Sequence, residues 1–282
     1  MTDLRTIVKG IAGLKPVPRV VHKILAIQQD PDSSMDDLAR VISHDATTTA
    51  NLLKAANSAL YGRTKPIESV QQAVVFLGMD EIVSLALMSN SSDNLKRPQE
   101  GYGLKTDDLW RNGIVSALVS QELCQKLALD NGHLVFTCAL LKDIGKVVLE
   151  QHVAAFAKEI SELVARGDHS FEEAEKQVIG IDHAELGAMT TQVWQFSEKM
   201  VDIIKYHHRP GESVLAPQET AIVHLSDTVC MMMGIGAGSD GLAYRFDQQL
   251  IESMGISDVD LQEIMAGIPE KLDDIESFIA LS

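Results

Sequence analysis

Apolar residues recur along the chain at the three- and four-residue spacing that forms one face of a helix. Two such faces consist of Leu38, Val41 and Ile42 and of Trp110, Ile114 and Leu118. Runs in which apolar and polar residues alternate between hairpin turns do not occur. The pattern therefore predicts an all-α fold.

Residues typical of helix ends divide this pattern into separate helices. A Ser or Asp with an acidic residue or Gln three positions later predicts a helix start at Ser33–Asp36, Ser69–Gln72, Ser170–Glu173 and Asp182–Glu185. Gly78 is expected to close the helix that begins at Ser69. One core helix is expected over about residues 134–150, and Pro217 is expected to be the first residue of another.

The stretch from Ser89 to Thr106 differs from the predicted helices around it. It is polar and contains Pro98, Gly101 and Gly103, which is typical of a linker or an exposed crossing. We therefore expect two helical lobes that meet near residue 100, an N-terminal lobe of residues 1–100 and a second lobe of residues 101–282.

Composition narrows the class of protein. Of the 282 residues, 45% are hydrophobic and 23% are charged, which is ordinary for a globular protein. No apolar run approaches the roughly 18 residues of a membrane span, and the first residues lack the pattern of a signal peptide. Cys124, Cys138 and Cys230 form no C-x-x-C pair and lie in apolar stretches. We therefore expect buried, reduced thiols and a cytoplasmic location.

The net charge argues against nucleic acid as a partner, and the lack of an apolar run long enough to span a membrane argues against a membrane. Forty acidic residues against 24 basic ones give a formal charge of −16. Such a surface repels a phosphate backbone, and no basic patch stands out in the sequence. We expect neither a nucleic acid nor a membrane as partner.

One short run carries recognisable chemistry. Residues 140–146 read Leu-Leu-Lys-Asp-Ile-Gly-Lys, which resembles the L-L-H-D-I-G-K core of the HD phosphohydrolase superfamily. In that superfamily the adjacent His and Asp bind metal with a His upstream, further His residues downstream and a later Asp. Imidazole and carboxylate suit divalent metals because each donates a lone pair, and a bound ion can generate hydroxide from water. The resemblance implies that the second lobe is an HD-like helical bundle.

The ligand set that this resemblance implies is incomplete. Asn112 stands where the upstream His is expected, and Lys142 replaces the His of the His-Asp pair. The ligand positions that remain are Asp143, His183, His207 or His208, and Asp227. We therefore expect no catalytic residue and no cofactor, and iron, manganese or zinc at the remaining positions is the disfavoured alternative.

Lys142 is the more informative of the two replacements. An ammonium group has three donors and no lone pair, so it cannot ligate a metal while it is protonated. It can instead take the place of the cation, because one positive charge facing Asp143 and Asp227 relieves part of their mutual repulsion. Our hypothesis is that Lys142 substitutes electrostatically for a metal ion and leaves a structured, chemically silent pocket.

Simpler roles compete for the other polar residues. For His183, His207 and Asp227 we favour helix capping and core hydrogen bonding over residual metal or ligand binding, and both over catalysis. Lys146 is an active-site residue in some hydrolytic relatives, but an exposed or helix-end lysine is the favoured interpretation here. Whether His207 or His208 faces the pocket is open at this point.

A second resemblance comes from the amino-terminal half. Its motifs are L-K-P-V-P at 14–18, I-S-H-D at 42–45, A-A-N-S-A-L-Y-G at 55–62, P-I-E-S-V at 66–70 and A-V-V-F-L-G at 73–78. Their order resembles the HDOD family, the HD-related output domain of bacterial signalling proteins, over about residues 14–235, with a C-terminal extension beyond. That family is generally regarded as non-catalytic. For the 55–62 run, close helix packing is favoured over a partner surface.

Two further runs are interpreted as structural. Gly234–Gly238 has the glycine content of a phosphate-binding loop, but it follows a helix and no G-K-[ST] follows it, so a helix-ending loop is expected. For Met231–Met233, a role in filling the core is favoured over a soft recognition surface.

Together these features predict a signal-transduction protein that works by binding a signalling protein. The partner, the pathway and the oligomeric state are open. The first alternative is a weak metal-dependent phosphohydrolase that acts on a nucleotide or cyclic dinucleotide. The second alternative is a small-molecule sensor that uses the remaining HD pocket.

Overall fold

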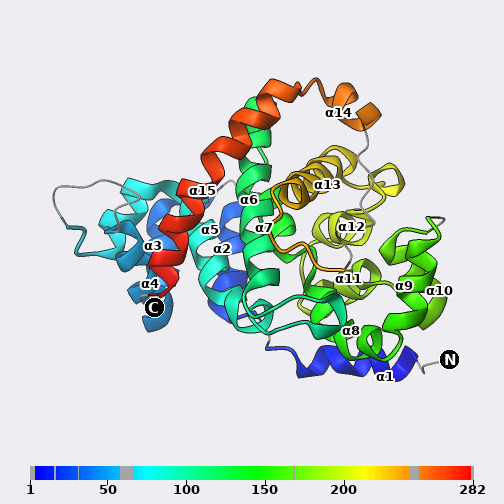
Figure 1. Ribbon diagram of the computed structural model, residues 1–282. Coiled ribbons are helices and arrows are strands. Elements are labelled where there is room, and N and C mark those ends of the chain that lie inside the picture. The colour runs from blue at the N-terminus through cyan, green and yellow to red at the C-terminus, as the bar shows by residue number, and fades with distance from the viewer. Residues whose placement is uncertain are drawn as a thin grey trace. The chain divides into compact units, whose positions relative to one another are not determined.

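The computed structural model describes residues 4–15, 17–30, 32–57, 66–167, 169–239, 241 and 248–280. Helices occupy most of these segments, and the only β pairing within them is an isolated bridge between Gln99 and Leu104 (Figure 1). The predicted all-α fold is confirmed. Two compact units are present, one of Met1–Lys15 and Asp93–Ala266 and one of Pro16–Ser92 and Gly267–Ser282. The first residues thus belong with the HD-like part of the chain, and the last residues belong with the amino-terminal helices.

The smaller unit is built on three consecutive helices, α2 (Arg19–Gln29), α3 (Met35–Ser43) and α4 (Ala46–Ala56), followed by the first part of α5 (Val70–Leu95). Its core consists of the apolar faces of these helices: Val21, Ile24, Leu38, Ile42, Leu52, Ala56, Ala73 and Val74. The capping box of α3 uses Ser34 and Asp37, one residue later than predicted.

Asn57 shows what part of the A-A-N-S-A-L-Y-G run does. Its Oδ1 accepts from the Ile67 backbone N–H at 2.6 Å, and its Nδ2 donates to the Ile67 carbonyl at 2.8 Å. These bonds hold the segment that leads into α5. The rest of the run, residues 58–62, lies outside the described residues.

Gly78 ends the first helix of α5, as predicted. At a φ of 80° it has a non-helical conformation, and Val70–Met79 and Glu81–Met88 are two helices bent by 105°. The helical path then continues to Leu95, so the first part of the predicted linker is helical. The remaining linker holds the 3₁₀ turn η3 (Glu100–Tyr102) and a left-handed Gly103, at φ 69°.

The larger unit carries the remaining helices. They are α1 (Leu4–Lys9), η1 (Gly10–Gly13), α6 (Asp108–Lys126), α7 (Gly132–Leu141), α8 (Ile144–Ala155), α9 (Ala157–Ala165), α10 (Phe171–Ile179), α11 (His183–Val193), α12 (Glu198–Tyr206), η4 (Pro210–Glu212), α13 (Pro217–Met232), α14 (Gln248–Met254) and the start of α15 (Asp258–Ala280). Helix α6 packs against α7 and α13, and α11 packs against α8 and α12. Predicted starts at Ser69, Ser170, Asp182 and Pro217 are confirmed.

The prediction of one helix over residues 134–150 is wrong. Helix α7 ends at Leu141 and α8 begins at Ile144, so Lys142 and Asp143 form the break between them. The break directs α8 against α11 at very short range: a Cβ at Gly145 would lie 1.9 Å from the His183 carbonyl oxygen. A continuous helix would not bring Lys142, Asp143 and His183 together in this way.

Several smaller predictions are settled by the same helices. All three cysteines are buried and free, as expected. The loop after α13 contains Gly234 and Gly236 at positive φ, which confirms a helix-ending loop. Met232 is 53% exposed, so core filling is wrong for this residue, because it faces outward on the last turn of α13.

Within the described part of the chain, no single helix combines the length and the hydropathy of a membrane span. Val70–Met79 and Glu81–Met88 reach both only as a pair, and this pair is bent by 105°.

Candidate functional site

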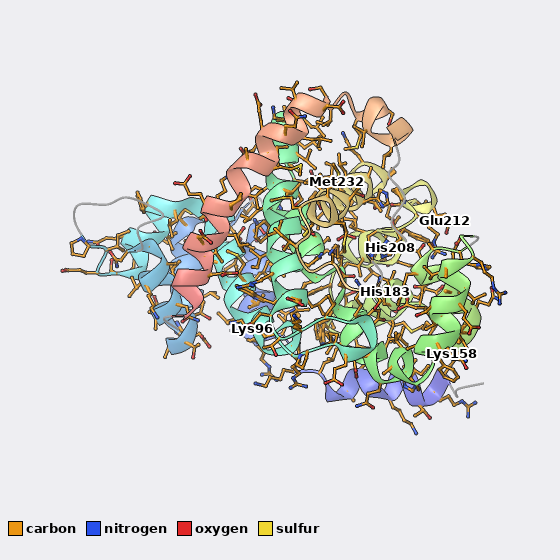
Figure 2. The ribbon with its side chains drawn as sticks, viewed as in Figure 1. Lys96, Lys158, His183, His208, Glu212 and Met232 are labelled. Carbon is orange, nitrogen blue, oxygen red and sulfur yellow. The ribbon has the colours of Figure 1, made fainter. Side chains whose placement is uncertain are left out.

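The predicted site residues gather inside the larger unit. They come from α6 (Asn112), the α7–α8 break (Lys142 and Asp143), the start of α11 (His183), the end of α12 (His207 and His208) and α13 (Asp227). All except His208 are buried, and the His208 side chain is only 10% exposed. The sticks in Figure 2 show His183 and His208 pointing toward each other between these helices.

Local chemistry fixes the entry of α11 into the site. Oδ1 of Asp182 accepts from the Glu185 backbone N–H at 2.7 Å, so Asp182 is the N-cap that the sequence predicts. The cap makes His183 the first helical residue. Its backbone N–H then donates to Oε2 of Glu175 at 3.0 Å.

The lysine half of the site consists of Lys142 with Asn112, Asp227 and Oδ2 of Asp143. Nζ of Lys142 lies 2.5 Å from Asn112 Oδ1, 2.5 Å from Asp143 Oδ2 and 2.9 Å from Asp227 Oδ1. The Lys142 side chain is 0% exposed. The ammonium therefore donates to two of these oxygens and forms an ion pair with the third, Asp227 Oδ1.

The charges of the lysine half support one another. Burial lowers the pKa of Lys142, but the carboxylates of Asp143 and Asp227 outweigh it and leave this pKa above its ordinary value. Burial raises the pKa of Asp143, but the ammonium groups of Lys142 and Lys146 hold it well below its ordinary range. Burial also raises the pKa of Asp227 above its ordinary value, although the nearby ammonium of Lys142 lowers it in part. Lys142 is therefore a charged cation at neutral pH.

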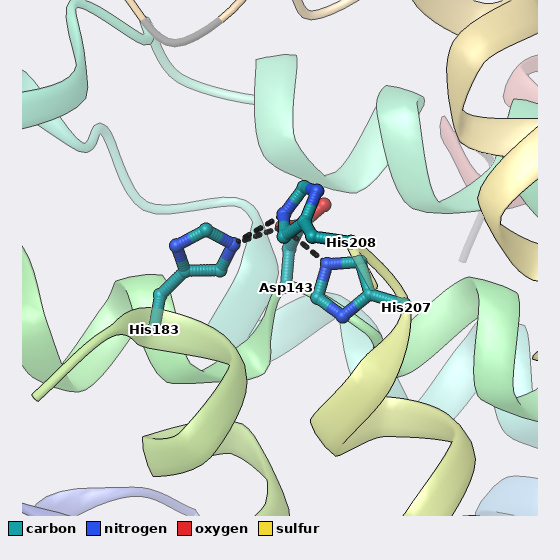
Figure 3. Close-up of side chains that lie close together, drawn as sticks. All are labelled: Asp143, His183, His207 and His208. Carbon is teal, nitrogen blue, oxygen red and sulfur yellow. Dashed lines mark hydrogen bonds and ion pairs between the residues drawn. The ribbon is translucent and has the colours of Figure 1, made fainter. Parts of the chain in front are cut away.

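The histidine half consists of His183, His207 and His208 around Oδ1 of Asp143 (Figure 3). Nε2 of His183 lies 2.9 Å from Nε2 of His208 and 3.6 Å from Asp143 Oδ1. Nε2 of His207 lies 3.9 Å from the same oxygen. Both His207 and His208 thus belong to the site, which answers the question that the sequence left open.

Each imidazole of the histidine half is oriented through its other nitrogen. Nδ1 of His183 donates to Glu175 Oε2 at 2.7 Å, and Nδ1 of His207 donates to the Ile204 carbonyl at 2.7 Å. Nδ1 of His208 lies 3.4 Å from Glu172 Oε2. Contacts of this kind fix the tautomer and ring orientation of metal-binding histidines.

Burial and neighbouring charges set the protonation of the three rings. Burial lowers the pKa of His183, but the contact with Glu175 outweighs it and raises this pKa to about 9. Burial holds the pKa values of His207 and His208 well below the ordinary value. Burial also raises the pKa of Glu172 to about 7. His183 is thus the charged ring, and the other two are neutral.

Three functional positions were missed or misjudged from sequence. Lys146 was interpreted as exposed or helix-end, but its side chain is 3% exposed and its Nζ lies 2.9 Å from Asp143 Oδ1, because the α7–α8 break turns the first turn of α8 inward. Glu175 was not singled out, although it orients His183. Tyr102, also missed, donates its hydroxyl to Glu175 Oε1 at 2.5 Å.

The two halves differ in whether they fit a metal ion. The lysine half does not fit, because an ammonium group lies within ion-pair distance of both carboxylates and Asn112 offers only an amide. The histidine half fits: its four ligand atoms all lie within 4.8 Å of one another, and His207 Nε2 is buried without a hydrogen-bond partner. For comparison, ligands about 2.0–2.2 Å from a tetrahedral zinc ion lie roughly 3.3–3.6 Å apart.

Relatives of known fold resemble the whole chain. A crystal structure of an HDOD domain protein with unknown function from Geobacter sulfurreducens has a TM-score of 0.71 at 24% identity and covers 98% of both chains. A "putative phosphohydrolase" from Shewanella amazonensis SB2B has a TM-score of 0.65 at 25% identity, with 97% of this chain and 95% of that chain covered.

The sequence comparisons agree with these structures. An uncharacterized protein of Treponema pallidum (strain Nichols) is 25% identical over 196 residues, which are 68% of this chain and 37% of that protein. The chain therefore spans little more than a third of the length of this curated relative. The HDOD domain family matches residues 14–210. This range contains every residue of the lysine and histidine halves of the site except Asp227. This chain belongs to the HDOD domain family.

Proposed function

We propose that this protein is a non-catalytic signal-transduction module that acts by binding a partner protein. One observation carries the proposal: the Lys142 ammonium lies between Asn112, Asp143 and Asp227, where the HD resemblance expects a metal ion. A hydrolytic HD site needs a metal to lower the pKa of water and to polarise a phosphoryl oxygen. A protonated lysine supplies neither a bound water nor an open coordination position.

Access to the site supports the same proposal. The side chains of both halves are at most 10% exposed, and so are those of Lys146, Glu172 and Glu175. A nucleotide or cyclic dinucleotide needs a surface cleft that buries most of its area. The same low exposure gives the small-molecule sensor no support. Membership of the HDOD family favours a signalling role, and the partner stays a prediction.

A weak metal-dependent phosphohydrolase is the second candidate. The intact histidine half favours it, because three imidazoles and one carboxylate are a ligand set that suits zinc or iron. The similarity to a structure named "putative phosphohydrolase" points the same way.

Hydrolysis of bis(p-nitrophenyl) phosphate and of a cyclic dinucleotide, with added Mn²⁺ or Fe²⁺, separates the two candidates. We expect no turnover by the wild-type protein above a protein-free control. Turnover by the wild type that the His207→Ala variant loses would overturn the proposal. The double variant Asn112→His/Lys142→His supplies the two missing ligands, so we expect it to bind more metal per chain than the wild type, as measured by elemental analysis.

A further inference from the structure

We propose that the histidine half binds a single transition metal ion and that Lys146 competes with this ion for Oδ1 of Asp143. The inference deepens the proposed function, on which it rests, because it gives a non-catalytic module a site with two alternative cations. The ion is a borderline divalent metal of the zinc class, since three imidazoles dominate the ligand set.

The orientation of the imidazoles supports the metal site. With Nδ1 of His183 and His207 held by hydrogen bonds to Glu175 and Ile204, the Nε2 atoms lie 3.6 and 3.9 Å from Asp143 Oδ1. His183, the charged ring, releases its Nε2 proton to solvent when it binds the metal. Nε2 of His207 is the clearest case, because the residue is 0% exposed and this atom has no hydrogen-bond partner. An unsatisfied buried polar atom is costly, and coordination would satisfy it.

Competition follows from the position of Lys146. This residue lies one helical turn after Asp143, and its Nζ reaches back to within 2.9 Å of Oδ1. Oδ1 is also the oxygen nearest to Nε2 of His183 and His207. A metal ion bound there and the ammonium group would repel each other and share the same lone pairs.

Asp143 cannot avoid this competition by using its second oxygen. Oδ2 lies 2.5 Å from the buried ammonium of Lys142, which is itself fixed by Asn112 and Asp227. The carboxylate therefore faces a permanent cation on one side and an exchangeable cation position on the other. The lysine half limits the site to one metal ion per chain.

The test is a titration of metal-free wild type and Lys146→Met with Co²⁺ and Zn²⁺, followed by calorimetry and by the visible absorption of Co²⁺. Met keeps an unbranched side chain, which can pack near the Tyr102 ring that Lys146 Nζ now overlies at 5.6 Å. Asp143 stays neutralised by Lys142 in this variant, so the fold is expected to persist. We expect one Co²⁺ per chain in Lys146→Met, with an affinity about tenfold or more above the wild type.

Two further variants make the comparison specific. Lys158→Met removes an exposed positive charge that pairs with Glu162 and not with Asp143, so its metal affinity should equal that of the wild type. Lys146→Met/His207→Ala removes a ligand and should lose the Co²⁺ absorption. If Lys146→Met proves unfolded by circular dichroism, Lys146→Gln replaces it, since Gln removes the charge and keeps a polar end.

The outcomes distinguish the two proposals. Equal affinities in the wild type and the folded Lys146 variant would overturn the competition. Absence of binding in that variant would overturn the metal site, and two ions per chain would overturn the role given to Lys142. Phosphodiester turnover by the loaded wild type would overturn only the proposed function.

Discussion

The two halves of the site share one carboxylate and differ in almost everything else. On the Oδ2 side of Asp143, a buried ammonium is surrounded by three oxygen atoms. On the Oδ1 side, three imidazoles converge, and one of them carries an unpaired nitrogen. One half is thus complete without a ligand, and the other is oriented as if for one. Both positions that depart from the expected HD ligands, Asn112 and Lys142, therefore lie in the lysine half.

The comparison also shows how each half balances its charges. The lysine half is internally compensated, because Lys142 faces Asp143 and Asp227 directly. In the histidine half, the charged ring of His183 is compensated by Glu175, which contacts its Nδ1. A carboxylate behind an imidazole increases its basicity and fixes its direction. Such an arrangement stabilises ligands for a cation, whereas the lysine half contains a cation of its own, the Lys142 ammonium.

Gly145→Ala should have the largest effect, because both halves depend on the crossing of α8 and α11. The added Cβ would lie 1.9 Å from the His183 carbonyl oxygen and 2.6 Å from the Gly187 backbone N, and neither backbone can yield. We expect a loss of more than about 4 kcal/mol in the free energy of unfolding, or no folded protein. Urea denaturation followed by circular dichroism measures it.

Gly211→Ala is the matched control, since a Cβ there meets no atom within 4 Å. A Gly145→Ala variant as stable as Gly211→Ala would show that α8 and α11 do not cross as closely as described. The two halves of the site would then not depend on that crossing.

Lys142→Ala tests the lysine half alone. Removing the ammonium leaves Asp143 and Asp227 buried with their repulsion restored, although Lys146 still contacts Asp143. Breaking a buried ion pair by removing one partner costs about 3–5 kcal/mol, and we expect a loss of this size near neutral pH. Lys158→Ala, at a side chain that is 86% exposed, should change the free energy of unfolding by less than about 0.5 kcal/mol. Equal stability of Lys142→Ala and the wild type would refute the electrostatic substitution.

The sequence predicts the features of this site that depend on neighbouring residues. The N-cap role of Asp182 follows from one residue and the three that come after it. The hypothesis that Lys142 takes the place of a cation rests on its position beside Asp143 and on the chemistry of an ammonium group, and Lys142 Nζ lies within ion-pair distance of Asp143 and Asp227. The helix start at Pro217, ahead of Asp227, is likewise a local signal.

Contacts between segments that are distant in the sequence could not be predicted from it. Tyr102 and Glu175 meet across 73 positions, and Lys146 is buried because a helix break not visible in the periodicity turns α8 inward. One signal was available for Glu175: it lies four residues after Phe171 and four before Ile179, both buried. An acidic residue on an apolar stripe indicates a buried partner, because an isolated carboxylate is costly to bury.

Tyr102→Phe should have the smallest of the three effects, and it tests the support behind the histidine half. The variant keeps the buried ring and removes only the hydroxyl that donates to Glu175 Oε1 at 2.5 Å. Hydrogen bonds to charged groups contribute about 1.5–3 kcal/mol, so we expect a loss of this order in the free energy of unfolding. Tyr206→Phe, at a half-buried ring beside Lys205, is the control and should cost less. A Tyr102→Phe variant no less stable than this control would mean that Glu175 needs no donor beyond His183, and that His183 is oriented by α10 and α11 alone.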